Sequence, residues 1–188
     1  MSRPSKVVVI AEDDRTHRFV WHFLKRLSYS RYQYTPRKVP GGSGEQFVRE
    51  AFATEVRAVR SRSASTVLIA VVDADNQSVE HRFRQFADSL RDEKIPARSD
   101  TEPIAILVPK RNIETWIRFL NQEPADEEQD YKPRSGSAED KRMTERVRSA
   151  ADAFCKLMRS TTPMPPAIIP SLERAVLEAR RVPSASRG

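Results

Sequence analysis

Three apolar segments of this chain lead into acidic side chains. The first two are rich in β-branched residues and almost uninterrupted: residues 7–11 precede Glu12, and residues 67–72 precede Asp73. The third, residues 104–108, is followed a few positions later by Glu114. Strands that are apolar throughout are typical of a parallel sheet covered on both faces, because neither face then meets water. The sequence therefore predicts an α/β fold with a mainly parallel sheet.

The acids that follow these strands are predicted to meet at one edge of the sheet. In parallel α/β sheets ligands bind beyond the carboxyl ends of the strands, where Glu12, Asp73 and Asp75 converge. An Asp-x-Asp pair at a strand end sends both side chains the same way. Crowded carboxylates raise one another's pKa, and a divalent cation relieves the repulsion; hard oxygen ligands favour Mg²⁺ or Mn²⁺. The alternative is that the aspartates cap the next helix and that Glu12 pairs with an arginine.

The spacing of apolar residues predicts strands and helices in alternation. Residues 29–39 are expected to hold a short further strand, which gives about four strands, with helices on both faces of the sheet. The expected order is β-α-β-α-β-α-β-α-α-α. We predict one domain in three parts: an α/β core over residues 1–120, an acidic loop over residues 121–140, and a helical extension over residues 141–188 that packs on the same domain.

The net charge of +7 points to a polyanionic partner such as nucleic acid. The charge is uneven: residues 15–62 hold eleven Lys and Arg against three Glu, and residues 121–140 hold seven acids against two bases. A basic N-terminal half can present the acidic edge to a phosphate backbone. The alternatives are a solvated charged surface and a surface for a protein partner. The candidate nucleic-acid contacts are Arg15, Lys38, Lys110 and Arg111.

Neither a membrane segment nor a disulfide is expected. No stretch approaches the ~18 apolar residues of a transmembrane helix, and the N-terminal residues lack the apolar block of a secretory signal. The single cysteine, Cys155, has no internal partner and is expected to be a packed thiol in a helix. We therefore expect a cytoplasmic protein without a membrane partner.

A strand ending in Glu, a helix, and a strand ending in Asp-x-Asp about sixty residues later resemble the Toprim domain of topoisomerases, primases and OLD-type nucleases. Residues 108–117, Val-Pro-Lys-Arg-Asn-Ile-Glu-Thr-Trp-Ile, resemble a segment of small stand-alone Toprim-like proteins of bacterial phage-defence loci. Those proteins often carry a Pro-Ser-Leu near the C-terminus, as residues 170–172 do here. The similarity covers residues 6–120 and extends loosely over the remainder.

The resemblance implies a metal-dependent nuclease that cuts DNA or RNA in antiviral defence beside a separately encoded ATPase. It gives Glu12 a general acid/base role and a place among the ligands of Mg²⁺ or Mn²⁺, with Asp73 and Asp75 as the metal-binding pair. It gives Glu114 the binding of a second cation or the ordering of the site. Trp116 is expected in the core.

Two departures from the Toprim pattern leave a second reading open. Toprim sequences usually place Gly after the glutamate, where this chain has Asp13, and many carry a further acid where Thr16 or His17 stands. A degenerate, non-catalytic Toprim-like scaffold or regulatory subunit that binds an ATPase is therefore the alternative. The oligomeric state is left open.

Other classes receive less support. Residues 10–16 also resemble the opening of a response-regulator receiver, with Lys110 as the candidate for its later lysine, but the spacing to Asp73 is too long and Asp75 doubles the acid. Three histidines and one cysteine form no zinc pattern. The glycines of residues 41–44 lack the lysine and the spacing of a P-loop.

Overall fold

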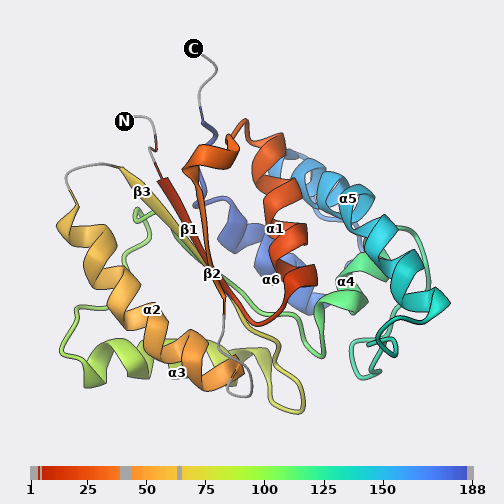
Figure 1. Cartoon of the computed structure of the whole chain (residues 1–188), viewed down its shortest axis with the longest axis horizontal. Helices are drawn as coiled ribbons and strands as arrows, with labels where there is room; N and C mark the ends of the chain where they lie inside the picture. Colours follow the sequence, from red (N-terminus) through yellow and green to blue (C-terminus); the bar gives the residue numbers. More distant parts are fainter. Residues whose placement is uncertain (1–3, 5, 39–43, 63–64, 186–188) are drawn as a thin grey trace.

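A four-stranded, all-parallel sheet forms the centre of the molecule (Figure 1). The computed structural model describes residue 4 and residues 6–38, 44–62 and 65–185. The predicted α/β class, with a mainly parallel sheet of about four strands, is confirmed. The strands lie in the order β2-β1-β3-β4 and are β1 (Lys6–Ala11), β2 (Tyr34–Lys38), β3 (Thr66–Val71) and β4 (Ile104–Leu107).

Helices pack on both faces of this sheet, as predicted (Figure 1). On one face α2 and α3 share a hydrophobic cluster with the strands, and on the other face α1, α4, α5 and α6 do so. The element order matches the expected one, with a short 3₁₀ helix, η1, added before β2. None of the described helices is long and apolar enough to cross a membrane. The helices are α1 (Asp14–Arg26), η1 (Arg31–Gln33), α2 (Gly44–Ser61), α3 (Val79–Asp92), α4 (Ile113–Leu120), α5 (Ala138–Arg159) and α6 (Pro170–Ala179).

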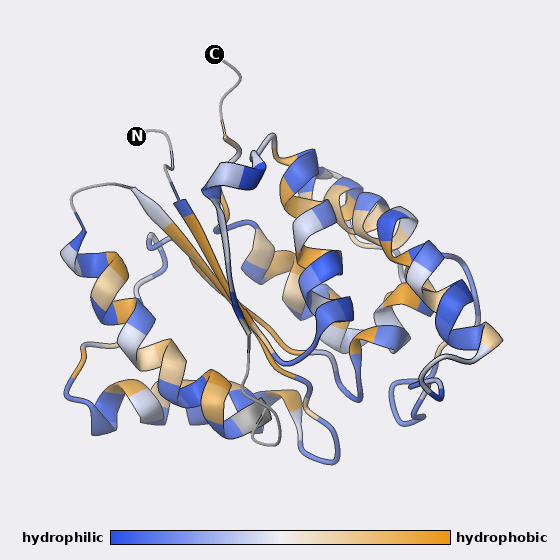
Figure 2. Ribbon diagram, viewed as in Figure 1, coloured by the Kyte–Doolittle hydropathy of each residue, from blue (hydrophilic) through white to orange (hydrophobic). Residues whose placement is uncertain are grey.

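The inner strands are apolar along their length because both of their faces are covered. Val7 and Val9 of β1 belong to the cluster under α1, whereas Val8 and Ile10 belong to the cluster under α2. Every residue of β3 and β4 is buried. In Figure 2 the hydrophobic colour accordingly runs along the inner strands, whereas the edge strand β2 is pale to blue and the helices carry both colours.

The segment predicted as an acidic loop holds no helix or strand before α5 begins, and it is fixed to the helices beside it. The Glu127 carboxylate accepts a hydrogen bond from the backbone N–H of Ser171 at 2.9 Å. The Asp130 carboxylate accepts one from the side-chain amide of Asn112 at 2.7 Å. The segment therefore links the start of α4 with the start of α6.

The C-terminal helices complete the core on the α1 face. Residues of α5 and α6 lie in the same hydrophobic cluster as β1 and α1. The chain after α6 returns to the end of α1: the Tyr29 hydroxyl donates to the carbonyl of Pro183 at 2.7 Å, and the N–H of Ala185 donates to the carbonyl of Leu27 at 2.8 Å.

The outer edge of β4 is closed by two side chains instead of another strand. Arg98 donates to the carbonyl of Ile104 at 2.6 Å, and the Glu178 carboxylate accepts from the N–H of Ile106 at 3.1 Å. Arg98 and Glu178 also form an ion pair with each other. Exposed edge groups invite pairing with another strand, and this pair satisfies them within the chain.

Candidate functional site

The carboxyl ends of β1 and β3 lie side by side where the strand order reverses. Ala11 pairs with Val71, and the chain passes from β1 outward to β2 before it returns to β3 on the other side of β1. Open parallel α/β sheets bind ligands at such a switch point. Glu12 follows β1 directly and Asp73 follows β3 by two residues, so both lie at this point.

Five acidic side chains gather there. The negative charges of four acids each raise the pKa of a fifth, Asp73, so all of them interact. The sequence predicted four of the five, and Asp13 is the addition. We call this group the carboxylate cluster: Glu12, Asp13, Asp73, Asp75 and Glu114.

Asp73 and Glu12 have the least compensation for their charge. Asp73 is 9% exposed, and burial, then the charges of Glu12 and Asp13, raise its pKa well above the ordinary value. Burial raises the pKa of Glu12 to about 7, although Arg82 and a hydrogen bond from the backbone of Asp73 oppose the rise. Glu12 Oε1 is buried and has no hydrogen-bond partner among the described residues. A buried acceptor without a partner is costly, so this oxygen is available to a ligand or a proton.

Asp75 lies in a turn held by a buried arginine. Because β3 ends at Val71, Asp73 and Asp75 do not alternate along a strand, and the expectation of two parallel side chains is wrong. Asp75 has a φ of 52°, and its side chain is 64% exposed. Arg82 of α3 donates to the carbonyls of Asp73 at 3.1 Å and Ala74 at 3.4 Å, and it lies 3.9 Å from the Asp75 carboxylate.

Arg82 is a positioning residue that sequence reasoning missed. It is 3% exposed, and its contacts fix the backbone that carries both aspartates. The available signal was its place three residues after Val79, on the apolar stripe of a predicted helix, where an arginine needs buried partners.

Glu114 is buried with an arginine partner. It is 1% exposed, and burial raises its pKa while Arg15 lowers it. Arg15 forms ion pairs with both Glu114 and Asp140, the latter in the first turn of α5. Arg15, predicted as a nucleic-acid contact, is therefore engaged inside the protein, where it ties the starts of α1, α4 and α5 together.

Asp13 has two roles at once. Its carboxylate caps α1 by accepting the backbone N–H of Thr16 at 2.8 Å. Its charge also raises the pKa values of Glu12 and Asp73. In the sequence it appeared only as a departure from the Toprim glycine; the run of three acids from Glu12 to Asp14 was the signal for a larger cluster.

The other predicted nucleic-acid contacts divide into two groups. Lys110 donates to the carbonyl of Gln77 at 3.3 Å, and Arg111 donates to the side chain of Asn76, so both lie beside the loop that carries Asp75. Because Lys110 contacts Gln77 and not Asp73, the geometry gives no support to a receiver site. Lys38 ends β2, but its side chain lies outside the described structure, as do residues 41–43 of the glycine segment.

The remaining candidates lie in the core. His17 Nδ1 is 3.0 Å from the Tyr34 hydroxyl of β2, so His17 contacts the sheet edge and does not replace an acidic ligand. Trp116 is fully buried, as expected, and its indole N–H donates to the Ser171 hydroxyl at 2.8 Å, which joins the two segments that carried the Toprim resemblance. Cys155 is buried, and burial raises its pKa, which fits the predicted packed thiol.

The donor set suits a hard divalent cation, but the side chains are not arranged around one. Carboxylate oxygens, one of them buried and unpaired at Glu12, are the ligands that Mg²⁺ and Mn²⁺ prefer. Over the ranges that the structure describes, no three His, Cys, Asp or Glu side chains are placed to hold a metal ion. The carboxylate oxygens of the cluster are therefore suitable ligands for the cation, although their positions do not form a site. Asp75 is the exposed member of the cluster.

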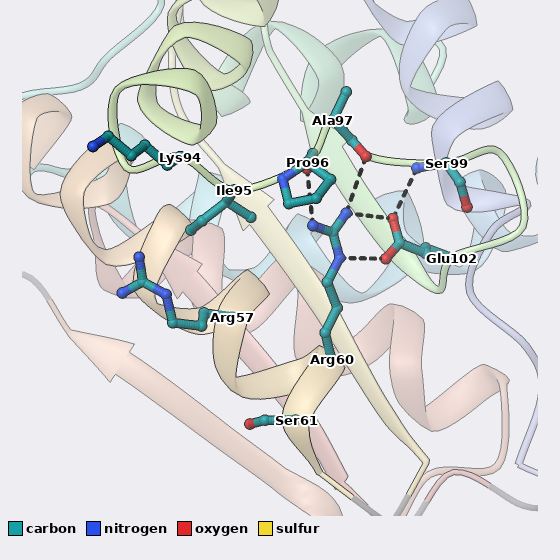
Figure 3. Close-up of a pocket in the computed structure, with 9 residues that line it drawn as sticks. All are labelled: Arg57, Arg60, Ser61, Lys94, Ile95, Pro96, Ala97, Ser99 and Glu102. Atoms are coloured by element: carbon teal, nitrogen blue, oxygen red, sulfur yellow. Dashed lines mark hydrogen bonds and ion pairs between the residues drawn. The ribbon is translucent and has the colours of Figure 1, made fainter.

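The larger cavities lie away from this cluster. One of about 580 Å³ opens at the amino edge of the sheet, between the ends of α2 and α3 (Figure 3). Its central arginine, Arg60, already binds Glu102 and the carbonyls of Pro96 and Ala97. Another of about 590 Å³ is a polar groove between α2 and α3. Neither brings acids to the carboxyl ends of the strands, so neither competes with the switch point as a catalytic site.

Fold and site together define a parallel α/β protein with a carboxylate cluster at its switch point. A scan against protein-family models and searches of curated proteins and of solved structures found no match. The Toprim resemblance therefore remains a prediction that rests on the residues themselves.

Proposed function

We propose that this protein is a metal-dependent nuclease that hydrolyses phosphodiester bonds of DNA or RNA. The observation that carries the proposal is the pair Glu12 and Asp73 at the switch point: Asp73 is buried, Glu12 is half-buried with one buried and unpaired oxygen, and burial raises the pKa of both. Acids with uncompensated charge in a ligand-binding position are characteristic of functional sites. The Toprim resemblance supports the same assignment, because it gives catalytic roles to these residues.

Each acid has a role in this proposal. Glu12, Asp73 and Asp75 would hold Mg²⁺ or Mn²⁺, and Asp75 is the exposed member of the three. A cation bound there supplies positive charge for a phosphate and lowers the pKa of a water molecule. Glu12 is also the proposed general acid or base: its pKa of about 7 applies to the protein without metal, and a cation bound nearby would lower it. Glu114, paired with Arg15, orders the site.

Positive side chains on the same edge support a phosphate-containing substrate. Lys110 and Arg111 border the loop that carries Asp75, and the net charge of the chain is +7. The resemblance extends the proposal to antiviral defence in the bacterial cytoplasm beside a separately encoded ATPase. ATP hydrolysis that copurifies with the tagged protein from its host, and is absent when an untagged strain is processed in the same way, supports that partnership.

The test is incubation of the purified chain with plasmid DNA, single-stranded DNA and tRNA in Mg²⁺, Mn²⁺ or EDTA. We expect cleavage that needs the metal and falls by about 100-fold or more in Glu12→Gln, the range for loss of a general acid or base. Asp73→Asn should also weaken Mn²⁺ binding in calorimetry. Asp152→Asn is the matched control, because it removes an acid of α5 that pairs with Arg26 of α1. It should leave both the cleavage and the Mn²⁺ binding unchanged.

The second candidate is a non-catalytic scaffold that binds an ATPase. Two observations favour it: the described acids form no preassembled metal group, and Arg15 already neutralises Glu114. A folded protein that cuts none of the three substrates, and whose partner binding survives EDTA and Asp73→Asn, establishes the scaffold in place of the nuclease.

A further inference from the structure

A pocket of arginine and aromatic side chains opens beside α1, next to the carboxylate cluster but outside it. Its volume is about 240 Å³, and α1, η1 and β2 contribute its walls. Asp14 on its rim directly follows Asp13 of the cluster, and the backbone N–H of His17 donates to the carbonyl of Asp13 at 3.1 Å. The lining residues are Asp14, His17, Arg18, Trp21, Arg31, Tyr34 and Pro36.

Two aromatic rings form the apolar part of the pocket. The centroids of Trp21 and Tyr34 are 5.1 Å apart, and the rings are inclined at 43°. Tyr34 is held in place because its hydroxyl donates to the carbonyl of His17 at 3.3 Å. Trp21 is only partly buried. A fixed and partly open aromatic surface suits the stacking of another flat ring.

Arginines give this aromatic surface a positive charge. The Arg31 guanidinium lies 5.4 Å from the centroid of Trp21 and 5.1 Å from that of Tyr34. Arg31 and Arg18 are both exposed. A guanidinium plane that rests on aromatic rings offers its outer face to a nucleobase and its charge to a phosphate.

We propose that this pocket binds one unpaired base of a single-stranded nucleic acid, while Arg18 and Arg31 contact the phosphates on either side of that base. The proposal rests on the proposed nuclease and names its substrate class: a strand with an unpaired base near the bond that is cut. A base inside a duplex cannot reach such a pocket unless it leaves the stack. The volume, below the ~300 Å³ lower limit for drug-sized ligands, fits a single base.

Tryptophan fluorescence tests this site directly. The chain has two tryptophans, and Trp116 is fully buried in the core, so a change caused by an added strand reports on Trp21. In EDTA, oligo(dT) and oligo(U) should quench the fluorescence, because bases stack on aromatic side chains whatever their sugar. A duplex of the same length, and an abasic strand that keeps the phosphates, should leave it unchanged.

Substitutions separate stacking from charge. Trp21→Leu and Arg31→Ala should weaken oligo(dT) binding by about 5- to 150-fold, the effect expected for a lost base-stacking contact. Because Trp21→Leu removes the fluorescent reporter, the affinities are measured by the anisotropy of a dye-labelled oligo(dT). Arg174→Ala is the matched control, because Arg174 is also exposed and lies 4.3 Å from an aromatic centroid, that of Phe83 on the other face of the sheet. It removes the same charge and should leave the affinity near the wild-type value.

The outcomes distinguish this inference from the proposed function. If single strands quench the fluorescence but the protein cleaves no substrate with either metal, base binding in the pocket is supported and the nuclease proposal is rejected. Metal-dependent cleavage that Trp21→Leu and Arg31→Ala leave unchanged, together with unchanged binding, keeps the nuclease and overturns the pocket. Equal losses in Arg31→Ala and Arg174→Ala also overturn it. If circular dichroism shows that Trp21→Leu is unfolded, the exposed Arg31 decides the matter alone.

Discussion

Acids of the same chemical type behave differently in this protein because each has a different partner. Glu114 is the most buried of them, but an arginine beside it opposes the effect of burial on its pKa. Asp75 is exposed to water, which solvates its charge. Glu12 lies between these cases, with burial, two like charges and one unpaired oxygen. The raised pKa values of Glu12 and Asp73 thus belong to acids for which burial and like charges outweigh any positive charge nearby.

The raised pKa of Glu12 predicts how stability depends on pH. In the unfolded chain this carboxyl titrates near its ordinary value of 4.5, and in the folded chain near 7. The folded state therefore holds the proton more tightly, and stability is lost as pH rises between these values and is constant above them. Relative to Glu12→Gln, the wild type should lose about 2 to 3 kcal/mol between pH 4.5 and 7.5.

Urea unfolding in EDTA at several pH values measures this difference. The comparison with Glu12→Gln cancels the titration of groups elsewhere in the chain, including His22, whose pKa burial lowers. Parallel stability curves for the two proteins would mean that the Glu12 carboxyl is solvated in the folded state.

The two roles of Asp13 can be separated by a pair of substitutions. Asp13→Ala and Asp13→Ser both remove the negative charge from the cluster, but serine retains an oxygen that caps α1. We expect Asp13→Ser to be more stable than Asp13→Ala by about 1 kcal/mol in urea unfolding. Identical stabilities would mean that the cap contributes nothing at this helix.

At the scale of elements, the loops after the strands carry the site and the helices hold the loops. Arg82 reaches from α3 to the turn after β3, and Arg15 reaches from α1 to α4 and α5. The acidic segment before α5 adds links to α4 and α6. The carboxylate cluster is therefore positioned by contacts between elements that are distant in sequence.

This arrangement explains how much the sequence could predict. Uninterrupted apolar runs identified the parallel sheet and the edge where Glu12 and Asp73 meet, because strand burial is a local pattern. The turn at Asp75 and the partner of Glu114 depend on Arg82 and Arg15, whose contacts are made only after the fold has formed. The aromatic pocket was missed for the same reason. Trp21 lies in a helix and Tyr34 in a strand, and the apolar pattern of each element does not indicate that the two rings come into contact.

The hydrogen bond from Trp116 to Ser171 joins α4 to α6 and predicts a cost for its loss. Ser171→Ala leaves the buried indole N–H without an acceptor, which should lower the free energy of unfolding by about 1 to 3 kcal/mol. Ser149→Ala is the control, because it removes an exposed hydroxyl that bonds Asn121 at 2.6 Å. Equal losses in urea unfolding for the two variants would contradict the prediction.

At the scale of the whole molecule, the closed edge of β4 predicts how the protein associates. Glu178→Ala leaves the partly buried Arg98 without this counter-charge and the buried N–H of Ile106 without an acceptor, which should cost about 1 to 3 kcal/mol. The opened edge should also cause concentration-dependent self-association in analytical ultracentrifugation. Glu173→Ala, an exposed position on the same helix, should change neither property. A monomeric Glu178→Ala protein of wild-type stability would show that the pair does not protect this edge.

The contact between the two ends of the described chain has a consequence for biosynthesis. The core under α1 needs residues 143–185, and the segment after α6 bonds back to Leu27 and Tyr29. A ribosome that makes this chain delivers β1 and α1 first and their covering helices last. The face under α2 and α3 can assemble once β4 has emerged, whereas the apolar side of α1 stays partly uncovered until residues 143–185 have followed. A nascent chain of this design is therefore exposed to chaperones and proteases on one face of its sheet until translation has passed α6.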